Sequence, residues 1–136
     1  MALTLNIVTP DGEKYHASAT GVLLPGSEGD FGVLPGHERF LTPLRTGEVE
    51  IQTEGETLYG SISEGFADVS GEEVTVLVES CELAHEIDTA RAELARSRAE
   101  QHLSQLGADE EEKRREQFEA ALQRAHNRLS VGNRKS

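Results

Sequence analysis

Apolar and polar residues alternate in short runs along the first part of the chain. Residues 3–7 and 48–52 place an apolar side chain at every second position, and residues 74–78 form a run rich in valine. A period of two is typical of a β-strand with one buried face. Turn sequences such as Asp11-Gly12 separate these runs at intervals of about 8–12 residues. The pattern therefore predicts a β-sandwich or barrel.

The pattern changes beyond residue 80, where Ala, Glu, Arg, Leu and Gln dominate, as in helices. Asp88 is a good N-cap for a helix that reaches about Gln105, and Gly107 then ends this helix. Residues 109–112 form a D-x-x-E capping box, which starts a second helix that reaches about Ser130. Because the connection is short, the two helices are predicted to form an antiparallel hairpin.

Each predicted helix carries a weak apolar face. The second helix offers a stripe spaced for one face, namely Phe118, Ala121, Leu122, Ala125 and Leu129. The first offers three larger side chains and a line of small ones, namely Ile87, Leu94, Leu103, Ala92, Ala95 and Ala99. Alanines bury little area, so the hairpin is held weakly by itself. We expect it to dock on the sandwich or on a partner, and to be able to leave either.

Glycine and proline mark the boundary between the two parts. Eleven of the thirteen glycines and all four prolines come before Ser80. Both residue types are unfavourable inside helices, so the helical part begins close to this point. The predicted fold class is α+β. An N-terminal antiparallel β-sandwich covers residues 1–84, and a C-terminal antiparallel helical hairpin covers residues 85–136.

Residues 24–44 combine turn-forming and apolar residues more densely than the rest of the chain. The turn formers are Pro25, Pro35, Pro43, Gly26, Gly29, Gly32 and Gly36. Proline fixes φ and glycine reaches positive φ at low cost, so the chain is expected to turn repeatedly here while its apolar residues anchor it to a core. Such a segment either holds a shape that a partner reads, or forms corner turns of the sandwich.

The net charge of −12 belongs to the first part of the chain. Residues 1–83 hold 15 acidic and 3 basic residues, whereas residues 84–136 hold 10 of each. Phosphates repel an acidic surface, which argues against nucleic acid and anionic lipid as partners. A polar or basic protein surface is the more plausible partner.

Hydropathy gives no membrane-crossing segment. No run approaches the roughly 18 apolar residues that a transmembrane helix needs. The N-terminus also lacks the basic start and long apolar run of a signal peptide. The chain is expected to stay in the cytosol or on a cytosolic membrane face.

The residue types that carry catalysis or bind metals do not form a convincing cluster. Cys81 lies among Glu79, Glu82 and Glu86, whereas a reactive cysteine needs positive surroundings, so a buried small side chain is expected. The five histidines lack metal-ligand spacing, and no phosphate-binding glycine motif occurs. A small acidic enzyme would therefore lack its nucleophile, base or metal, and neither catalytic nor metal-binding residues are predicted.

The arginines of the hairpin are more informative. Arg98, Arg124 and Arg128 have no acidic residue three or four positions away. In an antiparallel hairpin, Arg91 is expected opposite the neighbourhood of Arg124. Unpaired arginines gathered near the open end suit a polyanion such as a phosphate chain. Contact with an acidic partner surface, or simple solvation, are the alternatives.

Residues 26–44, GSEGDFGVLPGHERFLTPL, resemble the signature of the epsilon subunit of F-type ATP synthases. That family shows a G-S-x-G-acid-apolar-G-apolar-x-P-G-H block that runs into L-T. Its acid at the position of Asp30 is usually Glu, and its commoner S-G-G-F stands where residues 63–66 read SEGF. The resemblance implies that Glu28, Asp30 and His37 bind the gamma subunit or the c-ring.

Residues 87–92, IDTARA, are similar to the [IL]-D-x-x-R-A motif of ATP-binding epsilon subunits from bacteria. The resemblance implies that ATP binds as a regulatory ligand, with the Asp and Ala side of the motif at adenine and arginines of both helices at the phosphates. The implied ATP-binding residues are Glu82, Ile87, Asp88, Arg91, Ala92, Arg98, Arg124 and Arg128. For Asp88, the N-cap role is an equally good explanation.

The resemblance covers nearly the whole chain. It implies a non-catalytic subunit of a proton-translocating ATP synthase of the bacterial type, on the cytoplasmic face of the cell membrane and in contact with the membrane only through the complex. The sandwich would bind gamma and the c-ring, and the extended hairpin would reach the alpha/beta catalytic head and inhibit ATP hydrolysis. No cofactor would be required. A stand-alone ATP-sensing protein is the alternative.

Overall fold

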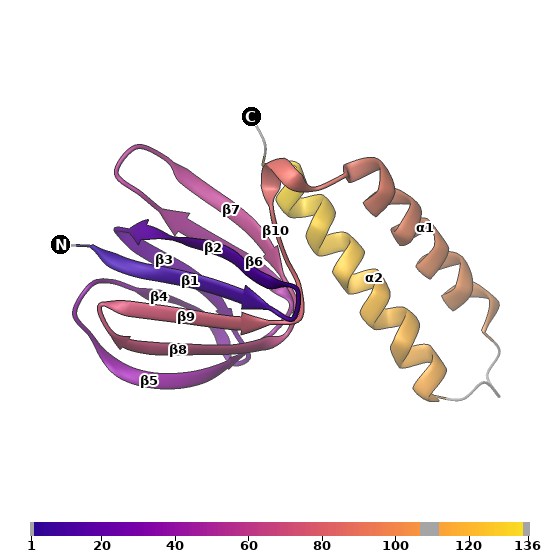
Figure 1. The fold of residues 1–136 in the computed structure, drawn as a ribbon. Helices are drawn as coiled ribbons and strands as arrows, with labels where there is room; N and C mark the ends of the chain where they lie inside the picture. The colour runs from indigo at the N-terminus through magenta and orange to yellow at the C-terminus, as the bar shows by residue number, and fades with distance from the viewer. Residues whose placement is uncertain (1, 107–111, 135–136) are drawn as a thin grey trace.

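The computed structural model describes residues 2–106 and 112–134, without the side chain of His37, and shows a β-sandwich followed by a pair of helices (Figure 1). The expected α+β fold class is therefore confirmed. Within the described residues, ten strands build the sandwich. They are β1 (Leu3–Thr9), β2 (Gly12–Ala19), β3 (Gly21–Gly26), β4 (Gly29–Val33), β5 (His37–Leu44), β6 (Gly47–Gln52), β7 (Thr57–Ile62), β8 (Gly65–Gly71), β9 (Glu73–Val78) and β10 (Cys81–Leu83).

The strands join in one hydrogen-bonded path with the order β10-β7-β6-β3-β5-β8-β9-β1-β2, and β4 pairs with β3. Paired strands are antiparallel, as expected, with the exception of β1 and β9, which run parallel. Strands β3 and β5 meet only at Gly26 and Leu44. This narrow link lets the sheet fold over, so that its two halves enclose the core (Figure 1).

The core forms from the inward positions of both halves of the sheet. In β1 the burial alternates strictly, as the period-two pattern predicted. Cys81 is also buried, as expected, and burial, helped by Glu86, raises the pKa of its thiol to about 12. The largest fully buried side chains of the sandwich are Leu3, Leu5, Ile7, Leu24, Ile51, Ile62, Val33, Val49, Val69, Val74 and Val76.

Residues 24–44 turn twice, at residues 27–28 and 35–36, as their composition predicted, but most of the segment is strand. They comprise the end of β3, all of β4 and all of β5. Pro25 and Pro43 lie inside strands, where a missing N–H is tolerated only if one edge is unpaired. Pairing of β3 with β6 stops at Leu23, and β5 meets β3 only at its last residue. At each proline, one edge of its strand is therefore unpaired, and no backbone N–H donor is needed there.

The helices are α1 (Thr89–Gln105) and α2 (Glu112–Gly132), joined to β10 through the 3₁₀ helix η1 (Ala84–Glu86). Asp88 is the N-cap of α1, as predicted, and its Oδ1 accepts a hydrogen bond of 3.1 Å from the Arg91 amide. The predicted turn at Gly107 and most of the capping box at 109–112 lie outside the described residues. The proposed domain boundary between residues 84 and 85 falls within η1 and stays a prediction.

The two helices pack side by side and antiparallel (Figure 1). Small side chains form the centre of the contact, because Ala92, Ala99 and Ala125 are buried. The stripe predicted for α2 is at least half-buried throughout. Leu94 was wrongly assigned to the packed face of α1, since 58% of it is exposed. The contact is therefore thin, as its composition indicated.

We predict that Gly65→Ala destabilises the sandwich by roughly 1–3 kcal/mol through overpacking. A Cβ at this position would overlap the Leu77 carbonyl oxygen and lie 2.8 Å from Val78 Cγ1. Gly55→Ala is the matched control, because nothing lies within 4 Å of a Cβ there. Urea unfolding of the two variants measures the difference, and equal midpoints would contradict the close approach.

Candidate functional site

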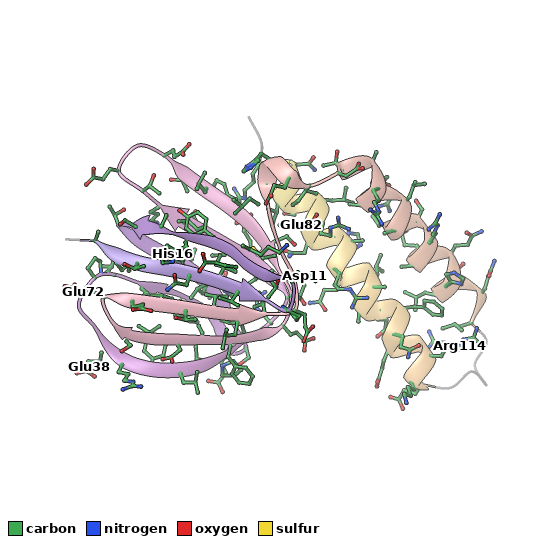
Figure 2. The ribbon with its side chains drawn as sticks, viewed as in Figure 1. Asp11, His16, Glu38, Glu72, Glu82 and Arg114 are labelled. Atoms are coloured by element: carbon green, nitrogen blue, oxygen red, sulfur yellow. The ribbon has the colours of Figure 1, made fainter. Side chains whose placement is uncertain are left out.

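The residues implied in nucleotide binding come from three elements that meet at one end of the hairpin. Glu82 is on β10, the IDTARA segment leads into α1, and Arg124 and Arg128 are in the C-terminal half of α2. Figure 2 shows Glu82 between the sandwich and α2. The sequence alone could not show that β10 runs along this side of α2.

Glu82 and Arg128 form a bidentate ion pair. Arg128 Nε and Nη2 donate to the two carboxylate oxygens of Glu82 at 2.6 and 3.1 Å. Arg124 lines the same small cavity, together with the hydroxyl-bearing residues Thr46, Ser61, Ser63 and Ser80. This cavity measures about 30 Å³, whereas pockets for small molecules usually exceed about 300 Å³. In this arrangement it has room for a water molecule, not for a nucleotide.

The register of the hairpin is fixed by one contact near each end. At the open end, a Cβ on Gly132 would lie 2.8 Å from Thr89 Cγ2, so these two residues are level. Near the connection, His102 stacks on Phe118 with ring centroids 4.6 Å apart and planes at 6°. Two residues that face each other across the hairpin, one on each helix, therefore have numbers that add up to about 220.

This register pairs the arginines differently from the expectation. Arg91 lies nearly level with Arg128, and Arg98 with Arg124, each within about two residues or roughly 3 Å of helix rise. The expectation that Arg91 lies opposite the neighbourhood of Arg124 was wrong by about five residues, or roughly one and a half helical turns. We call Arg91, Arg98, Arg124 and Arg128 the flank arginines.

The flank arginines lie on one side of the hairpin. Arg91, Arg98 and Arg124 each directly precede a buried alanine of the helix contact. Successive residues of a helix are rotated by about 100° around its axis, so the residue before a contact residue points to one side of the contact. In an antiparallel pair this side is the same for both helices. Arg128 is one turn beyond Arg124 on that flank. Four guanidinium groups are thus spread over two levels, a spacing that suits a chain of phosphates.

The remaining residues of the motif have structural roles in this conformation. Asp88 caps α1. Ile87 and Ala92 are buried, and Ile87 packs beneath Gly132. Among the described residues, Arg128 is the only flank arginine with an ion pair. Arg91, Arg98 and Arg124 therefore remain available to an anionic ligand.

The residues implied in rotor contact are divided between two ends of the sandwich. Glu28 and Asp30 line a groove of about 390 Å³ whose wall includes Phe31 and Phe40. Asp30 also forms an ion pair with Arg45. His37 begins β5 and pairs with Gly71, whereas Glu28 lies beyond the opposite end of that strand. The three residues therefore do not form one cluster.

An exposed apolar row crosses four strands and was not recognised in the sequence. Pro43, Phe66, Leu77 and Val8 are successive partners across β5, β8, β9 and β1. Phe66 is 52% and Leu77 49% exposed, and these two residues with Val8 line a groove of about 380 Å³. The available signal was an apolar residue at an outward position of each strand. Contiguous exposed apolar surface marks an interaction site.

Two other kinds of site are not found in the described parts of the chain. Residues 2–106 and 112–134 contain no group of three or more His, Cys, Asp or Glu side chains placed to hold a metal ion. Neither helix, over its described length, is long and apolar enough to cross a membrane.

Comparison with protein families identifies both parts of the chain. Residues 2–84 match the family described as ATP synthase, Delta/Epsilon chain, beta-sandwich domain. Residues 85–133 match the family described as ATP synthase, Delta/Epsilon chain, long alpha-helix domain. The two matches together span almost the whole chain.

Individual proteins agree with this result. The chain is 42% identical to the ATP synthase epsilon chain of Bacillus velezensis, over 93% of this chain and 94% of that one. It is 45% identical to the epsilon chain of Nitratidesulfovibrio vulgaris, over 96% and 95%.

Solved structures share the fold. A chain of the Euglena gracilis mitochondrial ATP synthase superimposes with a TM-score of 0.80 at 25% identity, over 97% of this chain and 81% of that one. A chain of the Tetrahymena thermophila mitochondrial ATP synthase gives a TM-score of 0.64 at 10% identity, which supports the fold alone. The chain therefore belongs to the delta/epsilon family of ATP synthase subunits, as an epsilon chain.

Proposed function

We propose that this epsilon chain is a non-catalytic subunit of the central stalk, which couples proton flow to ATP synthesis on the cytoplasmic face of a bacterial cell membrane. The observation that carries the proposal is the presence of both family domains, in order, over nearly the whole chain. The Euglena structure that it resembles is described as an OSCP/F1/c-ring assembly. Membrane contact would come only through the complex.

The exposed apolar row supports docking of the sandwich on another subunit. Its inward neighbours already fill the core, so Phe66 and Leu77 gain burial only from a partner. We assign this row to the gamma subunit, since a stable stalk contact needs an apolar centre. The groove at Glu28 and Asp30 is exposed and places two carboxylates beside Phe31 and Phe40, a mixed surface that suits the loops of the c-ring.

The thin helical hairpin supports a regulatory role. A switching element needs two states separated by only a few kcal/mol. The alanine-centred contact and the small docking area on the sandwich meet this condition. When extended, the hairpin would present its arginines to acidic surfaces of the alpha/beta head and inhibit ATP hydrolysis.

The flank arginines support ATP as a regulatory ligand of the folded hairpin. Phosphates bridging Arg91 and Arg98 of one helix to Arg124 and Arg128 of the other would hold the helices together. Because the cavity at Glu82 is too small for a nucleotide, ATP would bind along the open flank or require the hairpin to shift. No cofactor is needed for this role.

The second candidate function is a stand-alone ATP sensor. Three flank arginines, Arg91, Arg98 and Arg124, form no ion pair with any described residue. They favour the sensor role, because they are available to a ligand without another subunit. It differs from the stalk role in one respect: the sensor requires no assembly with gamma or the c-ring.

We predict that Phe66→Glu weakens association of the full chain with gamma by at least about tenfold, because a charge would have to be buried at the contact. Leu94→Glu is the control, since Leu94 has a similar exposure, 58% against 52% for Phe66, but lies on the hairpin. Surface plasmon resonance with purified gamma measures both. Equal affinities for the two variants would remove the apolar row from the stalk contact, and no binding by the unmodified chain would leave the sensor role.

We predict that deletion of residues 88–136 raises ATP hydrolysis by the assembled complex while the sandwich still assembles. The deletion removes the element that would reach the catalytic head. Steady-state ATPase assays on complexes rebuilt with full-length or shortened chain measure the change. Unchanged hydrolysis in a fully assembled complex would refute the inhibitory role.

We predict that Arg124→Ala lowers the affinity of the isolated full chain for ATP by roughly tenfold or more, the usual effect of losing a charge-assisted hydrogen bond. Lys113→Ala removes a charge from the other end of α2 and should leave the affinity unchanged. Isothermal titration calorimetry distinguishes the two. A matching loss in both variants would indicate general electrostatic attraction instead of a site.

A further inference from the structure

We propose that the last two turns of α2 and the two residues that follow the helix form a detachable polar clasp, with Arg134 as its outermost contact, that holds the hairpin on the sandwich and loosens as ionic strength rises. The clasp consists of Asn127, Arg128 and Arg134 and their partners on β6, β7 and β10. The clasp would be the contact that controls the regulatory movement of the hairpin, so its effect on the complex rests on the regulatory role proposed above.

The first contact of the clasp is made by Asn127. Its Nδ2 donates to the Gly47 carbonyl oxygen and to Ser61 Oγ, both at 2.8 Å. Ser61 is buried, so this amide satisfies a polar group that the hairpin covers. One side chain of α2 is thereby hydrogen-bonded to two neighbouring strands of the sandwich.

The second and third contacts are ionic. Arg128 pairs with Glu82, as described for the candidate site. Arg134 Nε donates to Glu48 Oε2 at 2.5 Å, and its guanidinium carbon lies 4.6 Å from the centre of the Tyr59 ring. The Glu48 hydrogen bond also raises the pKa of Arg134. Arg134 therefore combines an ion pair with a cation–π contact, both at the surface.

The distribution of contacts explains why the clasp controls docking. The hairpin reaches the sandwich strands chiefly through α2, against β6 and β7, while α1 packs on α2. Val131 is the buried apolar side chain of the last turns of α2. Docking thus depends on a small apolar area together with a few polar contacts.

Ionic contacts at the surface are weakened by salt. Charges in the clasp are partly exposed, and the Debye length is about 8 Å at physiological ionic strength. Such pairs contribute little individually, so the docked state is favoured by a narrow margin and opens without unfolding the sandwich. A partner with acidic surfaces would compete for the same arginines.

The test measures docking directly in the full chain. Spin labels are attached to cysteines at Glu54→Cys and Glu119→Cys in a Cys81→Ser background, and the distance distribution separates docked from undocked chains. Both label sites are exposed and lie outside the clasp. At fixed salt, we expect Arg134→Glu to raise the undocked-to-docked ratio about 3- to 10-fold. Rising NaCl should increase the same ratio in the parent.

Charge reversal supplies the controls. Glu48→Arg combined with Arg134→Glu should recover at least half of the effect, while Lys113→Glu, at the other end of α2, should leave docking unchanged. An unchanged ratio in Arg134→Glu, an equal effect of Lys113→Glu, or no recovery in the double reversal would each overturn the clasp. If distances change as expected but ATPase activity of the complex does not, the clasp stands and the inhibitory role fails.

Discussion

The difference in burial between the sandwich and the hairpin is the constraint on which the rest of the structure depends. Every inward position of β1 is buried, and both halves of the sheet contribute branched apolar residues to one core. The hairpin buries three alanines at its centre and few large side chains. Burial free energy scales with apolar area, so one part is a stable platform and the other is a loosely held attachment.

Because the core is already filled, the apolar residues on the outer face of the sheet cannot be buried within this chain. Phe66 and Leu77 are directly opposite each other on β8 and β9, with Ala67 and Val76 buried behind them. No inward movement could hide them, because the interior is close-packed. An exposed row of this kind is stable in a rigid sheet but costs free energy in water, which favours a permanent partner over a transient one.

The fold could be predicted to a large extent because its signals are local. The alternation in residues 3–7 and the N-cap at Asp88 each depend on neighbouring residues only, and both are confirmed. Pro25 and Pro43 were misleading, since whether a strand edge is unpaired depends on distant strands. Leu94 was misassigned because a helix with a weak stripe does not define its own buried side.

The candidate site could be predicted only in part, for a similar physical reason. The motif identified Arg91, and the other flank arginines followed from the resemblance and from their lack of acidic neighbours along the helix. Their pairing depends on the register, which is fixed by contacts between residues far apart, such as Thr89 with Gly132. The cross-strand row and the docking role of Asn127 likewise require the tertiary structure. Spacing along one helix carries no information about a neighbour that arrives from another part of the chain.

The charge distribution links the two parts to one function. The sandwich part carries the entire net negative charge, whereas the hairpin part holds equal numbers of acidic and basic residues. Arg128 and Arg134 of the hairpin part pair with Glu82 and Glu48 of the sandwich. An arginine that pairs with a carboxylate also suits a phosphate or an acidic protein surface. The docked hairpin, a bound nucleotide and an acidic catalytic head would thus compete for similar contacts. A weakly attached element that has no net charge but presents several arginines to an acidic platform is therefore suited to move between partners as their availability changes.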